Sequence, residues 1–365
     1  MPLKKEKIKL QVVCLVYNHE KFIRDALDGF LSQKTNFKFE VLIGDDCSTD
    51  NTSSIVREYV EKYPELFKYF RRSKNIGAQL NSYDLLKRID AEYLALCEGD
   101  DYWTDENKLQ KQVDFLDSHP HINGVFHNAE IKKEPEVKSW NSDFWFIPDE
   151  QGRQFWPTSI KSFDRNKKFY DICDVLEGII ATASIVYRVD PNFILPNWFK
   201  TAIAGDRPLH CMMVKSGRFA YIDEVMSVYR VQPSGAWFNK NSKKVDVKEI
   251  SDWVSLLENI NRYFNGQYKS LFDLHKYTTI TNGIKRAISQ QDTNSIYELI
   301  KLYPVYFYDL VKSVANSGVR EPDFYSSEYK VKILGMPLLK IKETSRRKDF
   351  YFLSAFKVFS IKRIS

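Results

Sequence analysis

Apolar segments of strand length alternate with amphipathic segments between residues 10 and 115, and this alternation constrains the fold most. The first apolar run, at 10–17, is rich in β-branched residues and barely alternates, which is typical of a strand buried on both faces of a parallel sheet. An amphipathic helix is expected next. The expected strands are 10–17, 39–44, 67–72 and 92–97, and the expected helices are 21–33, a segment around 55–60, and 79–89. The pattern predicts an α/β fold with a mainly parallel, doubly wound sheet.

Acidic clusters follow two of the expected strands, at 45–50 and 98–101. Ligands of doubly wound sheets bind beyond the carboxyl ends of the strands. We therefore expect both clusters to contribute to one site. Either Ser48 or Asp50 is expected to cap the helix that follows the first cluster.

The second cluster, Glu98-Gly99-Asp100-Asp101, places three carboxylates within four residues. Such charges repel unless a cation neutralises them or their pKa values rise. Mg²⁺ is commonly held by one or two carboxylates together with substrate phosphates. The alternatives are a solvated acidic turn or helix caps at Asp100 and Asp101. Neither G-x-G-x-x-G after a strand nor G-x-x-x-x-G-K-[ST] occurs, so a nucleotide phosphate would be held by metal and carboxylates.

The net charge of +6 is concentrated at one end of the chain. Residues 329–365 hold ten Lys and Arg against two acidic residues, a net charge of +8, and the preceding residues sum to −2. A nucleic-acid partner is therefore not expected. Apolar pairs alternate with basic residues in this tail, and each basic residue near an anionic leaflet contributes about 1 kcal/mol. The alternatives are peripheral membrane contact or a solvated β-hairpin docked on the helical region.

Composition excludes general disorder, because 43% of the 365 residues are hydrophobic and 15% are aromatic. No run reaches the roughly 20 apolar residues of a membrane span, and no secretory signal is visible. The five cysteines lack any C-x-x-C pair, which favours free thiols in a reducing compartment. We expect a cytoplasmic protein, with the tail at the inner face of the plasma membrane if it binds lipid.

The middle of the chain is less regular. Residues 140–156 are expected to form a long aromatic loop, 172–188 and 218–231 further strands, and 245–315 helices. The expected domains are 1–240, a helical region at 241–320 and a basic, β-like tail at 321–365.

An ordered series of motifs between residues 8 and 235 resembles the GT-A family 2 glycosyltransferases. The more specific blocks are Asp45-Asp46-Cys47-Ser48-Thr49-Asp50-Asn51-Thr52 and Glu98-Gly99-Asp100-Asp101. The weaker ones are Val12-Val13-Cys14-Leu15-Val16-Tyr17-Asn18, Asn75-Ile76-Gly77 and Gly205-Asp206. The resemblance implies a Rossmann-like GT-A domain and inverting transfer of a sugar, by default from a UDP-sugar, to a hydroxyl of a glycan or lipid-linked acceptor. The expected setting is surface polysaccharide biosynthesis, such as capsule or lipopolysaccharide.

The resemblance also implies roles for individual residues. Asp206 falls where the family carries its general base. Asp100, with Asp101 or Glu98, would bind Mn²⁺ or Mg²⁺ at the diphosphate. The implied donor-binding residues are Tyr17, Asn18, Asp45, Asp46, Asn75, Gly77, Asp100 and Arg230.

Two residues depart from the family pattern. Glu98 stands where many relatives have Asp. Tyr229-Arg230-Val231-Gln232 stands where many have Tyr-Arg-x-His, and the amide of Gln232 is a poorer metal ligand than imidazole. Arg230 is either a diphosphate partner or part of a structural salt bridge. His19 follows the first strand and is placed near the site.

Acceptor contacts are assigned to Trp103, Trp145 and Gln232, with the 140–156 loop as an acceptor-side lid. The ring of Trp103 either stacks on a sugar or belongs to the core. Two other functions stay open. A sugar nucleotidyltransferase would use a related sheet, but its Gly-rich basic loop is missing here. A catalytically inactive GT-A-like scaffold would not need the intact acidic residues.

Overall fold

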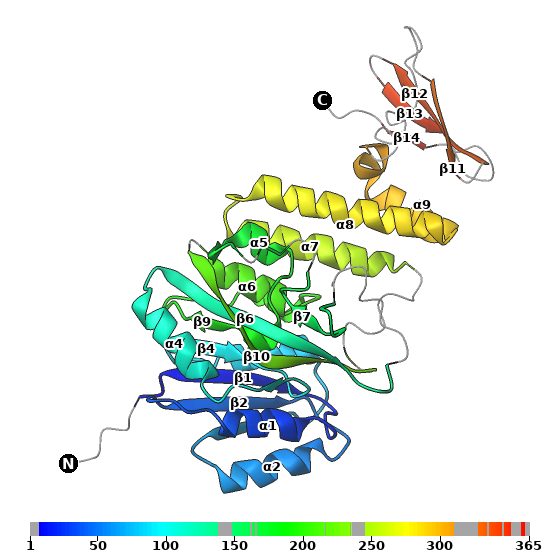
Figure 1. Cartoon of the computed structure of the whole chain (residues 1–365). Coiled ribbons are helices and arrows are strands. Elements are labelled where there is room, and N and C mark those ends of the chain that lie inside the picture. The colour runs from blue at the N-terminus through cyan, green and yellow to red at the C-terminus, as the bar shows by residue number, and fades with distance from the viewer. Residues whose placement is uncertain are drawn as a thin grey trace. The chain divides into compact units, whose positions relative to one another are not determined.

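The computed structural model describes two compact units of the chain (Figure 1). One comprises Met1–Ser242 with Glu258–Lys269, and the other Lys243–Leu257 with Ser270–Ser365. The described residues are 7–137, 148–160, 163–164, 166–215, 217–233, 235, 245–309, 328–333, 336–344, 347–351 and 359–361.

Parallel strands form the first half of the sheet in the first unit, in the order β3-β2-β1-β4. The strands are β1 (Leu10–Val16), β2 (Phe39–Asp45), β3 (Phe67–Arg71) and β4 (Tyr93–Leu96). The intervening helices are α1 (Ile23–Leu31), α2 (Thr52–Lys62) and α3 (Ala78–Leu86). The strands and helices expected in this half are confirmed.

The second half of the sheet is mixed because β9 (Val186–Arg188) lies antiparallel between β4 and β6 (Ile122–Lys133). β10 (Arg218–Val231) then pairs parallel to β6. Three short strands pair antiparallel to these two: β5 (Tyr102–Trp103), β7 (Gln154–Trp156) and β8 (Phe169–Tyr170). The result is a ten-stranded sheet in an α/β fold that is parallel over most of its long strands.

Helices bury the two faces of β1. The side chains of Val12, Cys14 and Val16 share a core with α1, α2 and α4 (Lys108–Ser118). On the opposite face of the sheet, α3 packs against β1 and its neighbour β2. The approach is so close that a Cβ at Gly44 of β2 would lie 2.7 Å from Leu85 of α3. Both faces of β1 are thus covered, as the unalternating apolar sequence predicts.

Two predictions for the irregular segments were wrong. Residues 154–156 of the expected aromatic loop form strand β7. The expected strand at 172–188 contains helix α5 (Ile172–Leu176), because Asp171 and Asp174 form a capping box, and β9 occupies only its last three residues. A five-residue helix is too short for periodicity to reveal. The expected strand at 218–231 is confirmed as β10.

The cap of α2 also differs from expectation. Its N-cap residue is Asn51 rather than Ser48 or Asp50. Asp50 Oδ1 still accepts a hydrogen bond from the Thr52 N–H at 3.0 Å. Ser48 instead serves the neighbouring loop, as described below.

The second unit contains the expected C-terminal helices. α7 (Val247–Tyr263) and α8 (Lys269–Ser289) each have residues in both units, and α9 (Thr293–Leu302) follows. Ile250, Ile280, Ile284 and Leu299 form the core of this helical part. The tail contains a four-stranded antiparallel sheet, in the order β11 (Glu328–Ile333), β12 (Met336–Thr344), β13 (Arg347–Tyr351) and β14 (Phe359–Ile361). Within the described residues, no helix has the length and apolarity needed to cross a bilayer.

A lysine lies inside the core of the first unit. The side chain of Lys108 is fully buried, donates from Nζ to Gln112 Oε1 at 2.7 Å, and places Nζ 4.2 Å from the Trp103 ring centroid. Burial disfavours the charged form and lowers the pKa of Lys108 to about 7.

We expect Lys108→Met to raise the free energy of unfolding at pH 7 by about 2–4 kcal/mol, with the lost hydrogen bond to Gln112 offsetting part of the gain. The unfolded chain keeps this proton up to about pH 10.4, so the wild type gains stability as pH rises from 7 toward 10. The variant lacks that gain, and the difference should shrink with pH. Urea unfolding across this range measures it, with exposed Lys87→Met as the control. A pH-independent difference would contradict the assignment.

Candidate active site

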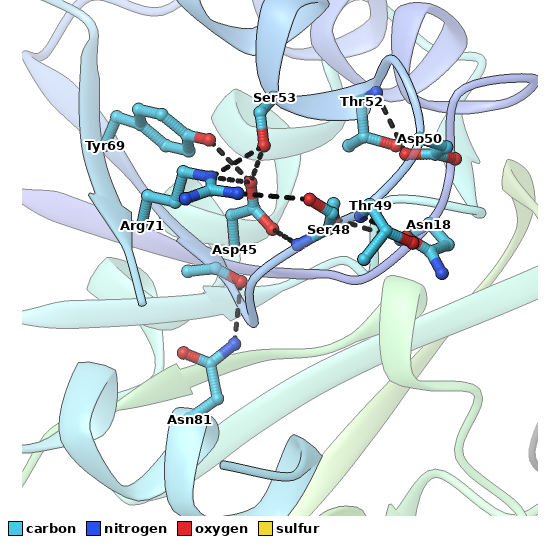
Figure 2. Close-up of polar contacts among 11 residues, drawn as sticks. Asn18, Asp45, Ser48, Thr49, Asp50, Thr52, Ser53, Tyr69, Arg71 and Asn81 are labelled. Carbon is cyan, nitrogen blue, oxygen red and sulfur yellow. Dashed lines mark hydrogen bonds and ion pairs between the residues drawn. The ribbon is translucent and has the colours of Figure 1, made fainter. Parts of the chain in front are cut away.

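Reciprocal hydrogen bonds join the loop after β1 to the loop after β2. The Asn18 N–H donates to Ser48 Oγ at 3.0 Å, and Asn18 Oδ1 accepts from the Thr49 N–H at 2.8 Å (Figure 2). Asn18 has φ 56°, a left-handed conformation that asparagine tolerates better than most residues. The predicted donor residue Asn18 is therefore bonded within the protein, and it fixes the path of the chain beyond β1.

A buried carboxylate organises the second of these loops. Asp45 is fully buried and accepts from Ser48 N at 2.8 Å, Ser53 Oγ at 2.5 Å and Tyr69 Oη at 2.6 Å, with Arg71 Nε 3.7 Å away (Figure 2). Desolvation raises the pKa of Asp45, but the hydrogen bonds outweigh it and hold the pKa below its usual value. Both oxygens of Asp45 are occupied by protein donors, so its position favours a structural role over the implied contact with the sugar donor.

Asp46 fixes the turn formed by the predicted motif Asn75-Ile76-Gly77. Its two oxygens accept from Ile76 N at 2.7 Å and Gly77 N at 2.8 Å. Gly77 has φ +87°, a conformation that L side chains rarely adopt. Asn75 closes the same turn through its Oδ1, which accepts from Gly77 N at 3.1 Å. The predicted residues Asp46, Asn75 and Gly77 are thus brought together just before α3.

The acidic turn after β4 is fixed from the end of β10. Asp101 Oδ1 accepts from the Arg230 N–H at 2.8 Å, and Gln232 Nε2 donates to Asp100 Oδ2 at 3.0 Å. Burial and the charges of Asp100 and Glu98 raise the pKa of Asp101. Its other oxygen, Oδ2, is buried and has no hydrogen-bond partner among the described residues. Gln232 therefore lies at the acidic turn, where the family pattern has its histidine.

Arg230 is engaged within the protein. Its buried guanidinium forms ion pairs with Asp25 at 2.6 Å and Glu134 at 2.8 Å, and Nη1 donates to the Asp100 carbonyl at 3.0 Å. The side chain also lies over the rings of Phe22 and Tyr102. These contacts favour the structural alternative over a diphosphate contact, and they hold the backbone of the acidic turn in place.

A cavity of about 240 Å³ adjoins the acidic turn. Glu98 and Asp206 both line it, and Asp206 is the first residue of α6 (Asp206–Val214). Burial, then the charges of Asp100 and Asp206, raise the pKa of Glu98 to about 8. The cavity therefore has one acidic residue that is protonated at neutral pH beside the predicted base.

The aromatic candidates are divided between surface and core. The ring of Tyr17 is 44% exposed just beyond β1, whereas Trp103 is buried. The Trp103 indole N–H donates to the Ala183 carbonyl at 2.9 Å and its ring meets Phe30 edge to face. This favours the core alternative for Trp103. Trp145 lies outside the described residues.

The donor set fits a cation that is held together with a substrate. Over the described part of the chain, no group of three or more His, Cys, Asp or Glu side chains is arranged to hold a metal ion. Glu98, Asp100 and Asp101 thus do not form a complete ligand set, because Asp101 Oδ1 is directed to Arg230. An oxygen of Asp100 and the unpartnered Asp101 Oδ2 still match the hard-oxygen preference of Mg²⁺ and Mn²⁺.

Several residues near the site were not identified from the sequence. Gln79, Ser82 and Thr182 line the cavity, and Tyr69 donates to Asp45. Gln79 and Ser82 lie in the first turns of α3, directly after the Asn75–Gly77 motif. The helix expected to begin at this motif was the signal that could have identified them. Nothing in the sequence pattern pointed to Thr182.

A family model matches part of the chain. The family model for glycosyl transferase family 2 matches residues 11–180. An uncharacterized protein of Mycobacterium tuberculosis is 37% identical over 235 residues, which cover 62% of this chain and 60% of that protein. The chain therefore spans about 60% of the length of that relative. A putative teichuronic acid biosynthesis glycosyltransferase of Bacillus subtilis is 34% identical over 107 residues, covering 29% of this chain and 41% of that protein.

Two solved structures are similar to this chain. A mannosyltransferase of Pyrobaculum calidifontis, solved with GDP-mannose and Mn²⁺, superposes with a TM-score of 0.50 at 17% identity, over 86% of this chain and 84% of that one. Residues 1–349 of Staphylococcus aureus TarS, solved with UDP-GlcNAc, match with a TM-score of 0.48 at 17% identity, over 98% of this chain and 100% of that one. The first of these supports the GT-A fold.

We expect Asp45→Asn to lower the free energy of unfolding by at least about 2 kcal/mol, because the amide nitrogen would meet groups that are themselves donors. The loss should be full near pH 7. It should shrink in acid, where the wild-type carboxylate is protonated. Urea midpoints at both pH values measure it, with the exposed Asp90→Asn as the matched control. Equal midpoints for wild type and Asp45→Asn at pH 7 would contradict the structural role.

Proposed function

We propose that this chain, whose residues 11–180 match the model for glycosyl transferase family 2, is a member of that family and transfers a sugar with inversion from a nucleoside-diphosphate sugar to an acceptor hydroxyl. The donor is by default UDP-linked. The acceptor is a glycan or a lipid-linked glycan. The observation that carries the proposal is one cavity lined by both Asp206 and Glu98, next to the acidic turn at the end of β4.

Asp206 is the proposed general base. Its carboxylate takes the proton of the acceptor hydroxyl while that oxygen forms a bond to the anomeric carbon. The bond from the anomeric carbon to the diphosphate oxygen breaks, and its electron pair leaves with the diphosphate. Asp206 Oδ1 accepts from the Arg207 N–H at 2.7 Å, which restrains the carboxylate at the start of α6. Attack from the face opposite the leaving group inverts the anomeric carbon.

Donor binding is assigned to the strand ends. We assign the exposed ring of Tyr17 to the nucleobase, and the turn at Asn75–Gly77, closed on Asp46, to the donor-binding edge of the sheet. Asp100 would hold Mn²⁺ or Mg²⁺ with the diphosphate, and the bound ion would neutralise the charge of the leaving group. The Mn²⁺ in the similar mannosyltransferase structure supports this assignment.

The proposed setting is surface polysaccharide biosynthesis, such as capsule or lipopolysaccharide. One relative is named for such a role: a putative teichuronic acid biosynthesis glycosyltransferase of Bacillus subtilis. Gln232, which touches Asp100, remains the proposed acceptor-side residue. A lipid-linked acceptor would suit a protein held at the inner face of the plasma membrane by its basic tail.

The activity is tested with a panel of UDP-, GDP- and dTDP-sugars. Release of nucleoside diphosphate is measured with Mn²⁺ or Mg²⁺ and with chelator. Asp206→Asn should lower transfer by at least about a hundredfold and leave donor affinity unchanged, because it removes the base and no diphosphate contact. The exposed Asp190→Asn is the matched control. No metal-dependent release from any donor would contradict the enzyme proposal. Unchanged turnover in Asp206→Asn would contradict the base.

Flotation with anionic vesicles tests the tail in the full-length chain. Replacing Lys330, Lys332, Lys340 and Lys342 with Gln should weaken binding by roughly 1 kcal/mol per residue. Four exposed lysines of the first unit, replaced in the same way, form the control: Lys34, Lys62, Lys74 and Lys87. Equal binding of both variants and the wild type would overturn the membrane contact.

A further inference from the structure

We infer that His19 is a ligand of the divalent cation, supplying from the loop after β1 the imidazole that Gln232 does not supply from the end of β10. This inference rests on the metal-assisted transfer proposed above. Many relatives have a histidine in the strand at the end of the domain. Here the acidic turn has a histidine on its other side.

The separation of His19 from the acidic turn fits two ligands of one ion. His19 Nε2 lies 3.9 Å from Asp100 Oδ2. That separation is too long for a hydrogen bond, whose heavy atoms lie about 2.7–3.2 Å apart. Two ligands held about 2.1 Å from the same ion lie about 3.0 Å apart when adjacent and about 4.2 Å apart when opposite. The observed distance falls between these limits.

The imidazole lacks the partners that a buried ring requires. Neither ring nitrogen of His19 has a hydrogen bond to any described residue, and Nδ1 is buried. The His19 and Asp100 side chains are 14% and 17% exposed, so both keep a small opening to solvent or ligand. Nδ1 faces Gly99 and Nε2 faces Asp100. A cation between Nε2 and Asp100 would therefore bind the ring nitrogen that is directed to the acidic turn.

The backbone on both sides of His19 is fixed, so the ring is held at the turn. Its neighbour Asn18 is bonded to Ser48 and Thr49. On the other side, the Glu20 N–H donates to Asp50 Oδ2 at 3.1 Å, and Glu20 Oε2 accepts from Asn51 N at 3.0 Å. The His19 carbonyl accepts from the N–H groups of Phe22 and Ile23 at the start of α1. A ligand held in this way needs little ordering when an ion binds.

Gly99 lets the ring approach the acidic turn. A Cβ at this position would lie 2.9 Å from His19 Nδ1, closer than real Cβ contacts. Gln232 completes the arrangement, because its Nε2 donates to the same Asp100 oxygen that faces His19. The amide thus orients the carboxylate, and the imidazole adds a nitrogen donor. A nitrogen donor favours transition-metal ions over Mg²⁺, so the site should prefer Mn²⁺.

Mn²⁺ bound to the full-length chain together with UDP tests the inference without any turnover. Pulsed EPR should detect a directly coordinated imidazole nitrogen in the wild type. His19→Ala should lose that nitrogen signal and weaken Mn²⁺ binding by at least about tenfold, while Mg²⁺ binding changes less. Gln232→His in the His19→Ala background should restore the nitrogen signal and the affinity. His121→Ala, which removes an exposed imidazole, should match the wild type.

The outcomes separate this inference from the proposed function. Mn²⁺ bound without a coordinated nitrogen in a chain that transfers sugar would overturn the inference and leave the function standing. A nitrogen signal that is lost in His19→Ala, in a chain that releases no nucleoside diphosphate from any donor, would support the ligand and overturn the function. A wild-type nitrogen signal that persists in His19→Ala would assign the imidazole elsewhere and overturn the inference. Asp100→Ala should abolish Mn²⁺ binding in either background.

Discussion

The buried carboxylate of Asp45 is the constraint on which the donor side of the site depends. A charge in this position is tolerated only because a backbone N–H, two hydroxyls and a nearby guanidinium surround it. Two of these donors, Ser48 and Ser53, follow β2, so their hydrogen bonds to Asp45 fix the conformation of the chain after β2. In this conformation Ser48 and Thr49 bond to Asn18, so the loop after β2 also fixes the chain beyond β1.

The acidic residues of the domain consequently divide into two groups. Asp45 and Asp46 face inward and are occupied by protein donors, so their placement makes them parts of the framework. Glu98 and Asp206 line a cavity, and Asp100 lies beside it at the same turn. Arg230 illustrates the same division among the cations. Its guanidinium forms ion pairs with Asp25 and Glu134, and it contributes to the site by holding the backbone of Asp100 in position.

The sequence predicted the first half of the sheet, because burial on both faces of a strand leaves a continuous apolar run. It did not predict what each carboxylate touches. Asp45 and Asp100 both follow strands, and only the donors contributed by distant residues such as Tyr69 and Gln232 distinguish them. The short α5 and β9 also escaped prediction. Three to five residues hold too little periodicity, and their state is set by caps and by strand neighbours.

The absent side chain of Gly99 ties together parts of the chain that are far apart in sequence. A Cβ there would press on Val16 and Ile23 as well as on His19, at 2.9–3.0 Å. The end of β1, the start of α1 and the acidic turn therefore share one small volume. A side chain at position 99 would require Val16, His19 and Ile23 to shift at the same time, so this one position restricts three residues that belong to other elements.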